Sequence, residues 1–287
     1  ALLAATFGVL TLLVPPLALV GAAIIALVTL RLGPWPGLRV ALLGGLGCGL
    51  LGWLLAGTPV PGLVLALGYW LPVMLLAAVL RASISLALTL QLAAGLGALG
   101  VLTFYVVLGD PAAWWRGLTG DMLDQMNRAG VISDPGTLEA LRTVFDIWAP
   151  LAPGQLVFSL LLALLLALFL ARWWQAILYN PGGFRQEFHA LRLGRPLATL
   201  MAAMIGLTLL LNWPLIVNLT LVLGLLYLIQ GIALVHGLVG RTGLATPWLV
   251  ALYAGLIFVP VLWQVLLVLG VVDAWVDFRT RLGPSGP

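Results

Sequence analysis

Leu156-Val-Phe-Ser-Leu-Leu-Leu-Ala-Leu-Leu-Leu-Ala-Leu-Phe-Leu-Ala171 is an apolar stretch that contains one serine and no charged residue. A helix of about 20 apolar residues crosses a hydrocarbon core about 30 Å thick. Within that core every backbone polar group must be bonded inside the protein, and this run is too long and continuous for a barrel strand. The stretch, taken as far as Ile177, therefore predicts a transmembrane helix.

Similar stretches recur along the whole chain, and the composition excludes a water-soluble protein. Of 287 residues, 63% are hydrophobic and 8% are charged, and the mean hydropathy is +1.17. A soluble domain is about one quarter charged, so 13 basic and 9 acidic side chains cannot cover a protein of this size. We therefore exclude a soluble enzyme and a nucleic-acid-binding domain, and we expect a single transmembrane domain over residues 1–287.

Turn-forming residues divide the apolar sequence into about eight spans, within a range of seven to nine. The predicted spans are 38–55, 63–80, 84–108, 156–177, 196–211, 215–239 and 249–272, preceded by an apolar run over 1–30. Pro15-Pro16 interrupts that first run, which is either one broken span or two, because proline removes a helical hydrogen bond. No basic segment precedes the run, so we expect no signal peptide. The predicted fold class is all-α, a polytopic transmembrane helical bundle.

The placement of arginine predicts the orientation of the bundle. All 13 cationic residues are arginine, and alternate threading puts most of them in connections on one side, which the positive-inside rule makes cytoplasmic. The expected location is the bacterial inner membrane. The same threading leaves Asp277 to Arg281 on the external side. Either the rule fails there, or the break at Asn212-Trp213-Pro214 is not a full reversal.

The segment 110–150 predicts an amphipathic helical hairpin on the external side. It carries six acids and three arginines. Asp110-Pro111 and Asp134-Pro135 each supply an N-cap residue followed by proline at the first helical position, and apolar residues then recur at helical spacing. We expect this insertion to cap the bundle surface, to form a lid over an outward cavity or to dock a partner.

The segment 180–195 predicts a helix at the cytoplasmic interface, with apolar residues on one stripe and cationic residues on another. Such a helix attracts lipid phosphates; the alternatives are docking of a cytoplasmic protein and binding of an anionic substrate headgroup. The candidate contact residues are Arg185, His189, Arg192 and Arg195.

Chemistry that needs ionised or metal-binding groups is poorly supported by the sequence. No Asp or Glu falls inside a predicted span, there is no lysine for a Gly-x-x-x-x-Gly-Lys phosphate loop, and the two histidines lack metalloprotease spacing. We expect no catalytic residues, no metal and no other cofactor. Neutral polar groups remain inside the spans, and their partners are either other helices or a ligand. The candidate substrate-binding residues are Trp70, Gln91, Asn218, Tyr227, Gln230, His236 and Gln264.

Small residues on the span 215–239 predict close approach of another helix. Thr220, Gly224, Tyr227 and Gly231 share one face of that span, and small side chains let helix backbones come together. The one cysteine, Cys48, lies in an apolar run and is expected to be a packing residue.

Two stretches resemble a known family. Trp173-Trp174-Gln175-Ala176 leading into Asn180-Pro181-Gly182-Gly183-Phe184-Arg185, followed by Glu187-Phe188-His189, resembles the proteobacterial branch of the YybS-like family of bacterial inner-membrane proteins. Asp273-Ala-Trp275-Val-Asp277-Phe278-Arg279 resembles the ending of that family. The family is grouped loosely with the substrate-binding S components of energy-coupling-factor transporters and with the rod-shape protein MreD. Ala18, Ala22 and Ala26 are similar to the stripe by which S components contact their coupling subunit.

Three functional hypotheses follow. The first is a non-enzymatic module that binds a small or lipidic substrate as part of a transporter, together with transmembrane or cytoplasmic partner subunits. The alternative is a scaffold or assembly factor of the cell envelope, similar in role to MreD, that uses the hairpin and the 180–195 helix as contact surfaces. A third is a membrane enzyme on lipid-linked substrates, which requires Asp110, Asp121 or Asp124 to cluster with an arginine around a cavity. Membrane lipids are expected partners in each case, and nucleic acid in none.

Overall fold

The computed structural model describes residue 6 and the ranges 17–242 and 247–281, and this part of the chain is helical without any strand. The helices in chain order are α2 (Leu17–Leu32), α3 (Pro34–Ala56), α4 (Val60–Leu65), the π-helical turn η1 (Ala66–Trp70), α5 (Leu71–Ser83), α6 (Leu86–Leu108), α7 (Pro111–Arg128), α8 (Pro135–Trp148), the 3₁₀ turn η2 (Ala149–Leu151), α9 (Ala152–Tyr179), α10 (Gly183–His189), α11 (Arg195–Leu211), α12 (Pro214–Thr242), α13 (Pro247–Phe258), α14 (Val261–Val276) and α15 (Phe278–Arg281). Five helical segments are long and apolar enough to cross a membrane, and four other apolar helices are shorter. The predicted all-α membrane bundle is confirmed, whereas the expected break at Pro15-Pro16 lies outside the described residues.

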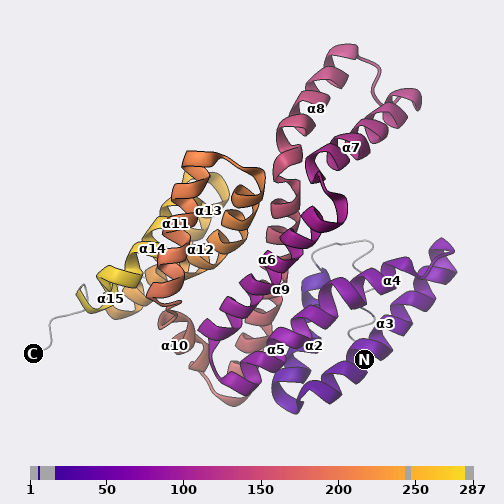
Figure 1. The fold of residues 1–287 in the computed structure, drawn as a ribbon. Helices are drawn as coiled ribbons and strands as arrows, with labels where there is room; N and C mark the ends of the chain where they lie inside the picture. The colour runs from indigo at the N-terminus through magenta and orange to yellow at the C-terminus, as the bar shows by residue number, and fades with distance from the viewer. Residues whose placement is uncertain (1–5, 7–16, 243–246, 282–287) are drawn as a thin grey trace, which may run out of the picture.

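Helix α9 is the centre of the bundle (Figure 1), because it packs against α2 on one side and against α12 on the other. The first group of helices comprises α2 to α5, and the second comprises α11 to α15. Ala22 and Ala26 of α2 are almost fully buried within this packing. The alanine stripe that resembles the coupling surface of S components is therefore covered by helices of the same chain.

A π-helical turn interrupts the predicted span 63–80. The Leu71 amide bonds the carbonyl oxygen of Ala66, five residues back, directly before Pro72, which has no amide proton to donate. Proline inside a helix clashes with the preceding turn, and a π-bulge is one way to absorb that clash. Helices α4 and α5 thus form one continuous segment, Gly62–Ser83, that is long enough to span a membrane.

Helices α12 and α14 run parallel and pack closely, as the small-residue stripe predicts. The direction follows from the two ends of this packing. Leu267, in the first half of α14, contacts Gly224 in the first half of α12, whereas Arg279 of α15, which follows α14, accepts a hydrogen bond from Arg241 in the last turn of α12. At the closest point, a methyl group added to Gly231 would lie 2.0 Å from the Leu266 carbonyl oxygen.

This parallel packing corrects the prediction of one span over 249–272. Two parallel helices joined in sequence require the segment between them to return, so the chain reverses at Val259-Pro260, between α13 and α14. The C-terminal segment consequently lies at the same end of the bundle as Arg192 and Arg241, to which it is bonded. The apparent exception to the positive-inside rule thus arose from a missed reversal at Val259-Pro260, and neither of the two explanations given from sequence is needed.

Helices α7 and α8 form the predicted hairpin, and both predicted N-caps are present. Asp110 accepts a hydrogen bond from the Ala113 amide (3.0 Å), and Asp134 accepts one from the Thr137 amide (2.7 Å). The hairpin does not lie flat on the bundle: it extends beyond the other helices, with α8 continuing through η2 into α9 (Figure 1). This arrangement does not favour a cap that lies on the bundle surface, and the lid and docking roles stay predictions.

Candidate functional site

The ionised side chains of the chain are divided between two ends of the bundle. The hairpin segment 110–150 holds six of the nine carboxylates and three of the 13 arginines. Outside it, the sequence has ten arginines and three acids, Glu187, Asp273 and Asp277. These three acids lie at the end opposite the hairpin, where Arg172 binds Glu187 through two nitrogens. That end consequently has a large excess of positive charge.

A buried ion pair stands at the corner between α14 and α15. Asp273 and Arg279 are 3% and 1% exposed, and Arg279 Nη1 donates to Asp273 Oδ2 at 2.8 Å. The other carboxylate oxygen accepts from the Phe278 amide at 3.1 Å, where α15 begins. The Nε and Nη2 groups of Arg279 find no acceptor among the described residues. The expectation that only neutral polar groups occupy the interior is wrong here.

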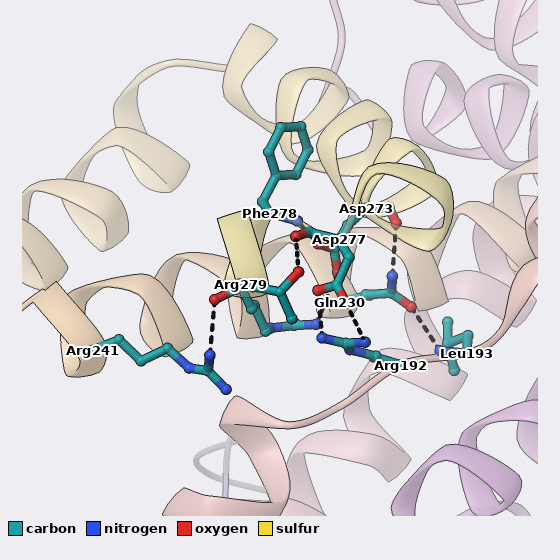
Figure 2. Close-up of polar contacts among 10 residues, drawn as sticks. Arg192, Leu193, Gln230, Arg241, Asp273, Asp277, Phe278 and Arg279 are labelled. Carbon is teal, nitrogen blue, oxygen red and sulfur yellow. Dashed lines mark hydrogen bonds and ion pairs between the residues drawn. The ribbon is translucent and has the colours of Figure 1, made fainter. Parts of the chain in front are cut away.

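Three further arginines bind the same corner. Arg192 holds Asp277 through both carboxylate oxygens, at 2.9 and 2.5 Å, and Arg241 Nη1 donates to the Arg279 carbonyl at 2.8 Å (Figure 2). Arg195 Nε donates to the Ala274 carbonyl (3.3 Å). Although burial disfavours its charge, the hydrogen bond and charge of Arg192 hold the pKa of Asp277 below its ordinary value.

The connection between α10 and α11 is fixed by two glutamines from other helices. Gln230 of α12 accepts from the Leu193 amide (2.8 Å) and donates to the Gly270 carbonyl of α14 (2.7 Å). Gln91 of α6 donates to the Leu193 carbonyl (2.9 Å). Both backbone polar groups of one buried residue, Leu193, are thereby satisfied by side chains, as buried backbone requires.

A cavity of about 480 Å³ lies beside this cluster, between α10 and the last turn of α12. Its lining includes Arg185, His189, Gly237, Gly240 and Arg241. Burial, together with the positive charges of Arg185 and Arg279 and the proximity of His236, lowers the pKa of His189 from its ordinary value. A histidine of lowered pKa is neutral at pH 7, so the charge of the cavity comes from its arginines.

In the described part of the chain, the predicted substrate-binding residues are spread over separate contacts. Gln91 and Gln230 meet at Leu193, where both serve the fold. Asn218 bonds the Gly154 amide, the Pro150 carbonyl and the Tyr105 hydroxyl, and so joins α12 to the start of α9 and to α6. The side-chain amide of Gln264 faces the carbonyls of Pro260 and Val261 at the start of its own helix, which assigns its nitrogen as the group that donates to them.

The remaining three candidates, Trp70, Tyr227 and His236, have other surroundings. Trp70 and Tyr227 are fully buried, and neither the indole nitrogen nor the phenol oxygen has a hydrogen-bond partner within the described chain. His236 bonds the Tyr253 hydroxyl at 2.9 Å and stacks near His189, with ring centroids 5.9 Å apart. His236 is thus the candidate nearest to the arginine-lined cavity.

Of the predicted headgroup-contact residues, Arg185 and His189 line the cavity. Arg192 and Arg195 instead bond to Asp277 and to the Ala274 carbonyl at the α14–α15 corner. Sequence reasoning missed the roles of Asp273, Asp277 and Arg279. The signal available in the sequence was the grouping of these three charged residues at the end of an apolar run. In the structure, Asp277 adopts a left-handed conformation that ends α14 (φ 51°).

Comparison with known proteins gives one match. The family described as Predicted membrane protein (DUF2232) matches residues 2–274, nearly the whole chain, in agreement with the resemblance noted from Trp173 to His189. No curated protein and no solved structure is significantly similar to the chain.

Proposed function

Because the chain belongs to the DUF2232 family of predicted membrane proteins, we propose that it is a non-enzymatic module that binds a small or lipidic substrate as part of a transporter. The observation that carries this proposal is the α13–α14 hairpin, whose two short helices leave and return at the arginine-rich end, next to the cavity. We place that end at the cytoplasmic face of a bacterial inner membrane, following the positive-inside rule.

The length of these two helices supports the proposal. At 12 and 16 residues they are about 18 and 24 Å long, whereas the hydrocarbon core is about 30 Å thick. Short or proline-interrupted segments mark substrate sites in many transporters, because broken helices bring backbone polar groups and flexible joints into the membrane.

One backbone carbonyl near the break between α13 and α14 is bonded by a side chain. The Trp263 indole donates to the Leu256 carbonyl across the turn at 2.8 Å, so one carbonyl near the end of α13 has a partner other than lipid. An unsatisfied carbonyl in lipid costs several kcal/mol. Such a turn is stable within the apolar layer and allows the hairpin to end there.

Two of the three acids invoked for an enzyme have other partners. Asp110 caps α7, and Asp124 binds Arg142 at 2.6 Å on the exposed hairpin. Neither belongs to the lining of the arginine-rich cavity, which supports a binding role over a catalytic one.

The test is purification from native membranes in a mild detergent, followed by native mass spectrometry. We expect the chain to carry a retained small molecule or lipid, or a copurifying membrane subunit, in stoichiometric amount. The matched control is a variant with Pro260→Ala and Val259→Leu, which favours a continuous helix over the turn and should lose the retained species. Purification of the bare chain from every membrane tested, with no difference between the two proteins, contradicts the proposal.

A scaffold role is the second candidate, favoured by the projecting α7–α8 hairpin. Trp114, Leu118 and Met122 of α7 are exposed along one side of a helix that stands clear of the bundle. Cross-linking from Leu118 in cells, with Arg128 as a position in the same helix but off that stripe, tests it. A single protein partner captured only from Leu118 supports a scaffold; labelling by lipid alone, or equally from both positions, counts against it.

A further inference from the structure

The cavity between α10 and α12 has cationic walls and no carboxylate of its own. Resting on the proposed function of a substrate-binding module, we propose that this cavity binds a phosphate group, held by Arg185, Arg241 and Arg279. The phosphate belongs either to a lipid headgroup or to a soluble phosphate compound, because both present the same charged oxygens.

The carboxylates near the cavity are already engaged. Glu187 is bound by Arg172, Asp273 by Arg279 and Asp277 by Arg192. All other acids of the sequence lie in the segment 110–150. Neither Arg185 nor Arg241 therefore has a carboxylate partner, and the positive charge of the cavity is left for a ligand from outside the chain to balance.

The buried guanidinium of Arg279 points to the same ligand. Its Nη1 is used by Asp273, but its Nε and Nη2 have no acceptor in the described structure, although the side chain is 1% exposed. An unsatisfied buried charged donor is costly. Arg279 Nε lies beside Gly237, where an added Cβ atom would be 3.3 Å away, and Gly237 lines the cavity. A ligand oxygen seated there would accept from this nitrogen.

Two glycines of α12, Gly237 and Gly240, leave room for α10 at the wall of the cavity. An added Cβ atom at Gly240 would lie 3.0 Å from His189 Cε1 and 3.5 Å from Arg185 Nη2. Without those methyl groups, α10 can press against α12 and bring Arg185 close to Arg241. Arginine suits this role because its planar guanidinium matches phosphate oxygens in pairs.

The volume of about 480 Å³ exceeds the space that a bare phosphate fills, so the group attached to the phosphate also enters the cavity. An aromatic cluster adjoins the cavity through His189, which lines it: the rings of His189 and His236 lie 5.9 Å apart, and those of His236 and Phe188 lie 5.6 Å apart.

The test compares anions by thermal unfolding of the intact chain in a maltoside detergent that contains no phosphate. Inorganic phosphate, and phosphatidic acid in mixed micelles, are each titrated against sodium chloride of equal ionic strength. The variants are Arg185→Gln, Arg185→Lys and, as the matched control, Arg128→Gln in the hairpin. Arg185 has no ion pair to lose among the described residues, so its replacement should leave the fold intact.

We expect a saturable rise in Tm for the parent and for R128Q. For R185Q we expect binding weaker by about tenfold or more, the loss typical of one charge-assisted contact, and R185K should lie between. A response to inorganic phosphate assigns a soluble ligand, and a response to phosphatidic acid alone assigns a lipid headgroup. An equal response of R185Q and the parent, or no response to either phosphate beyond that to sodium chloride, overturns the proposal. Should R185Q fail to fold, R185K against R128Q decides in the same way.

The outcome is separable from that of the proposed function. Phosphate binding without any transport partner or retained substrate leaves the site in place and removes the transport role. If the chain retains a partner or substrate, and R185Q neither reduces that retention nor weakens phosphate binding, the proposed function is supported and the phosphate site is refuted.

Discussion

Gln91 and Gln230, from two different helices, bond opposite sides of the same residue: Gln91 donates to the Leu193 carbonyl, and Gln230 accepts from the Leu193 amide. Leu193 is 2% exposed, and it lies in the short link between α10 and α11. The amides that sequence reasoning assigned to substrate therefore hold this link against α6, α12 and α14.

Replacing Gln230 with leucine should be clearly destabilising. The change leaves the buried Leu193 amide without an acceptor and removes the bond to Gly270, so we expect a loss of about 1–3 kcal/mol. Gln91→Leu makes a useful comparison, because Gln91 is only partly buried and water or lipid headgroups can replace it. Thermal unfolding of both variants in detergent measures the difference. Equal losses for the two variants would contradict this account.

Asp273 and Asp277 should respond very differently to the same substitution. D273N leaves Arg279 buried without a counter-charge, which costs about 3–5 kcal/mol, whereas D277N breaks a partly exposed pair worth at most about 1 kcal/mol. Chemical denaturation of the two variants measures this. A double replacement, D273L with R279M, should recover most of the loss, because a buried pair replaced by apolar groups costs little.

These side chains also show where sequence reasoning succeeds and fails. The spans 84–108 and 156–177 fall on α6 and α9 because length and apolar composition alone decide whether a segment crosses lipid. The reversal at Val259-Pro260 was missed because it contains no glycine, no asparagine and no charge. Inside an apolar run, a proline marks a kink and a full turn equally well.

The polar contacts were less predictable than the helices. Asp273 falls one residue past the predicted span, so the sequence does not place it among the buried groups; only the fold of α15 brings Arg279 back over it. The partners of Gln91 and Gln230 are 102 and 37 residues away. A single sequence identifies an amide that needs a partner but not whether that partner is a ligand or a backbone group.

The Arg192–Asp277 pair should give a pH-dependent contribution to stability. The pKa of Asp277 is lowered in the folded chain, so its contribution is fully present above the ordinary aspartate value near 3.8 and is lost as pH falls through the folded value. Asp277 is faced by Arg192 and Thr280. The Tm difference between the parent and D277N should therefore be constant near pH 7 and shrink toward zero as pH falls below the folded pKa of Asp277. A difference that grows on acidification would contradict this sign.

The contact between α12 and α14 should not accept a methyl group at Gly231. An added Cβ atom would lie 2.0 Å from the Leu266 carbonyl oxygen, so the two backbones must separate, at a cost of about 1–3 kcal/mol or more. Gly206 in α11 has no atom within 4 Å of an added Cβ, and its replacement with alanine should stabilise the helix by up to about 1 kcal/mol. Thermal unfolding of G231A and G206A should give shifts of opposite sign.

The reversal at Val259-Pro260 makes a prediction about sidedness. Thr280 follows α14, Asn180 follows α9 and Gly130 lies at the tip of the hairpin; all three are exposed. With Cys48 replaced by alanine, single cysteines at these positions are treated in intact cells with a membrane-impermeant maleimide. Because α12 and α14 run parallel, T280C and N180C should share one behaviour and G130C should show the other, with only G130C labelled if the arginine-rich end is cytoplasmic. Labelling of T280C together with G130C, and not with N180C, would place a full span in 249–272 and refute the reversal.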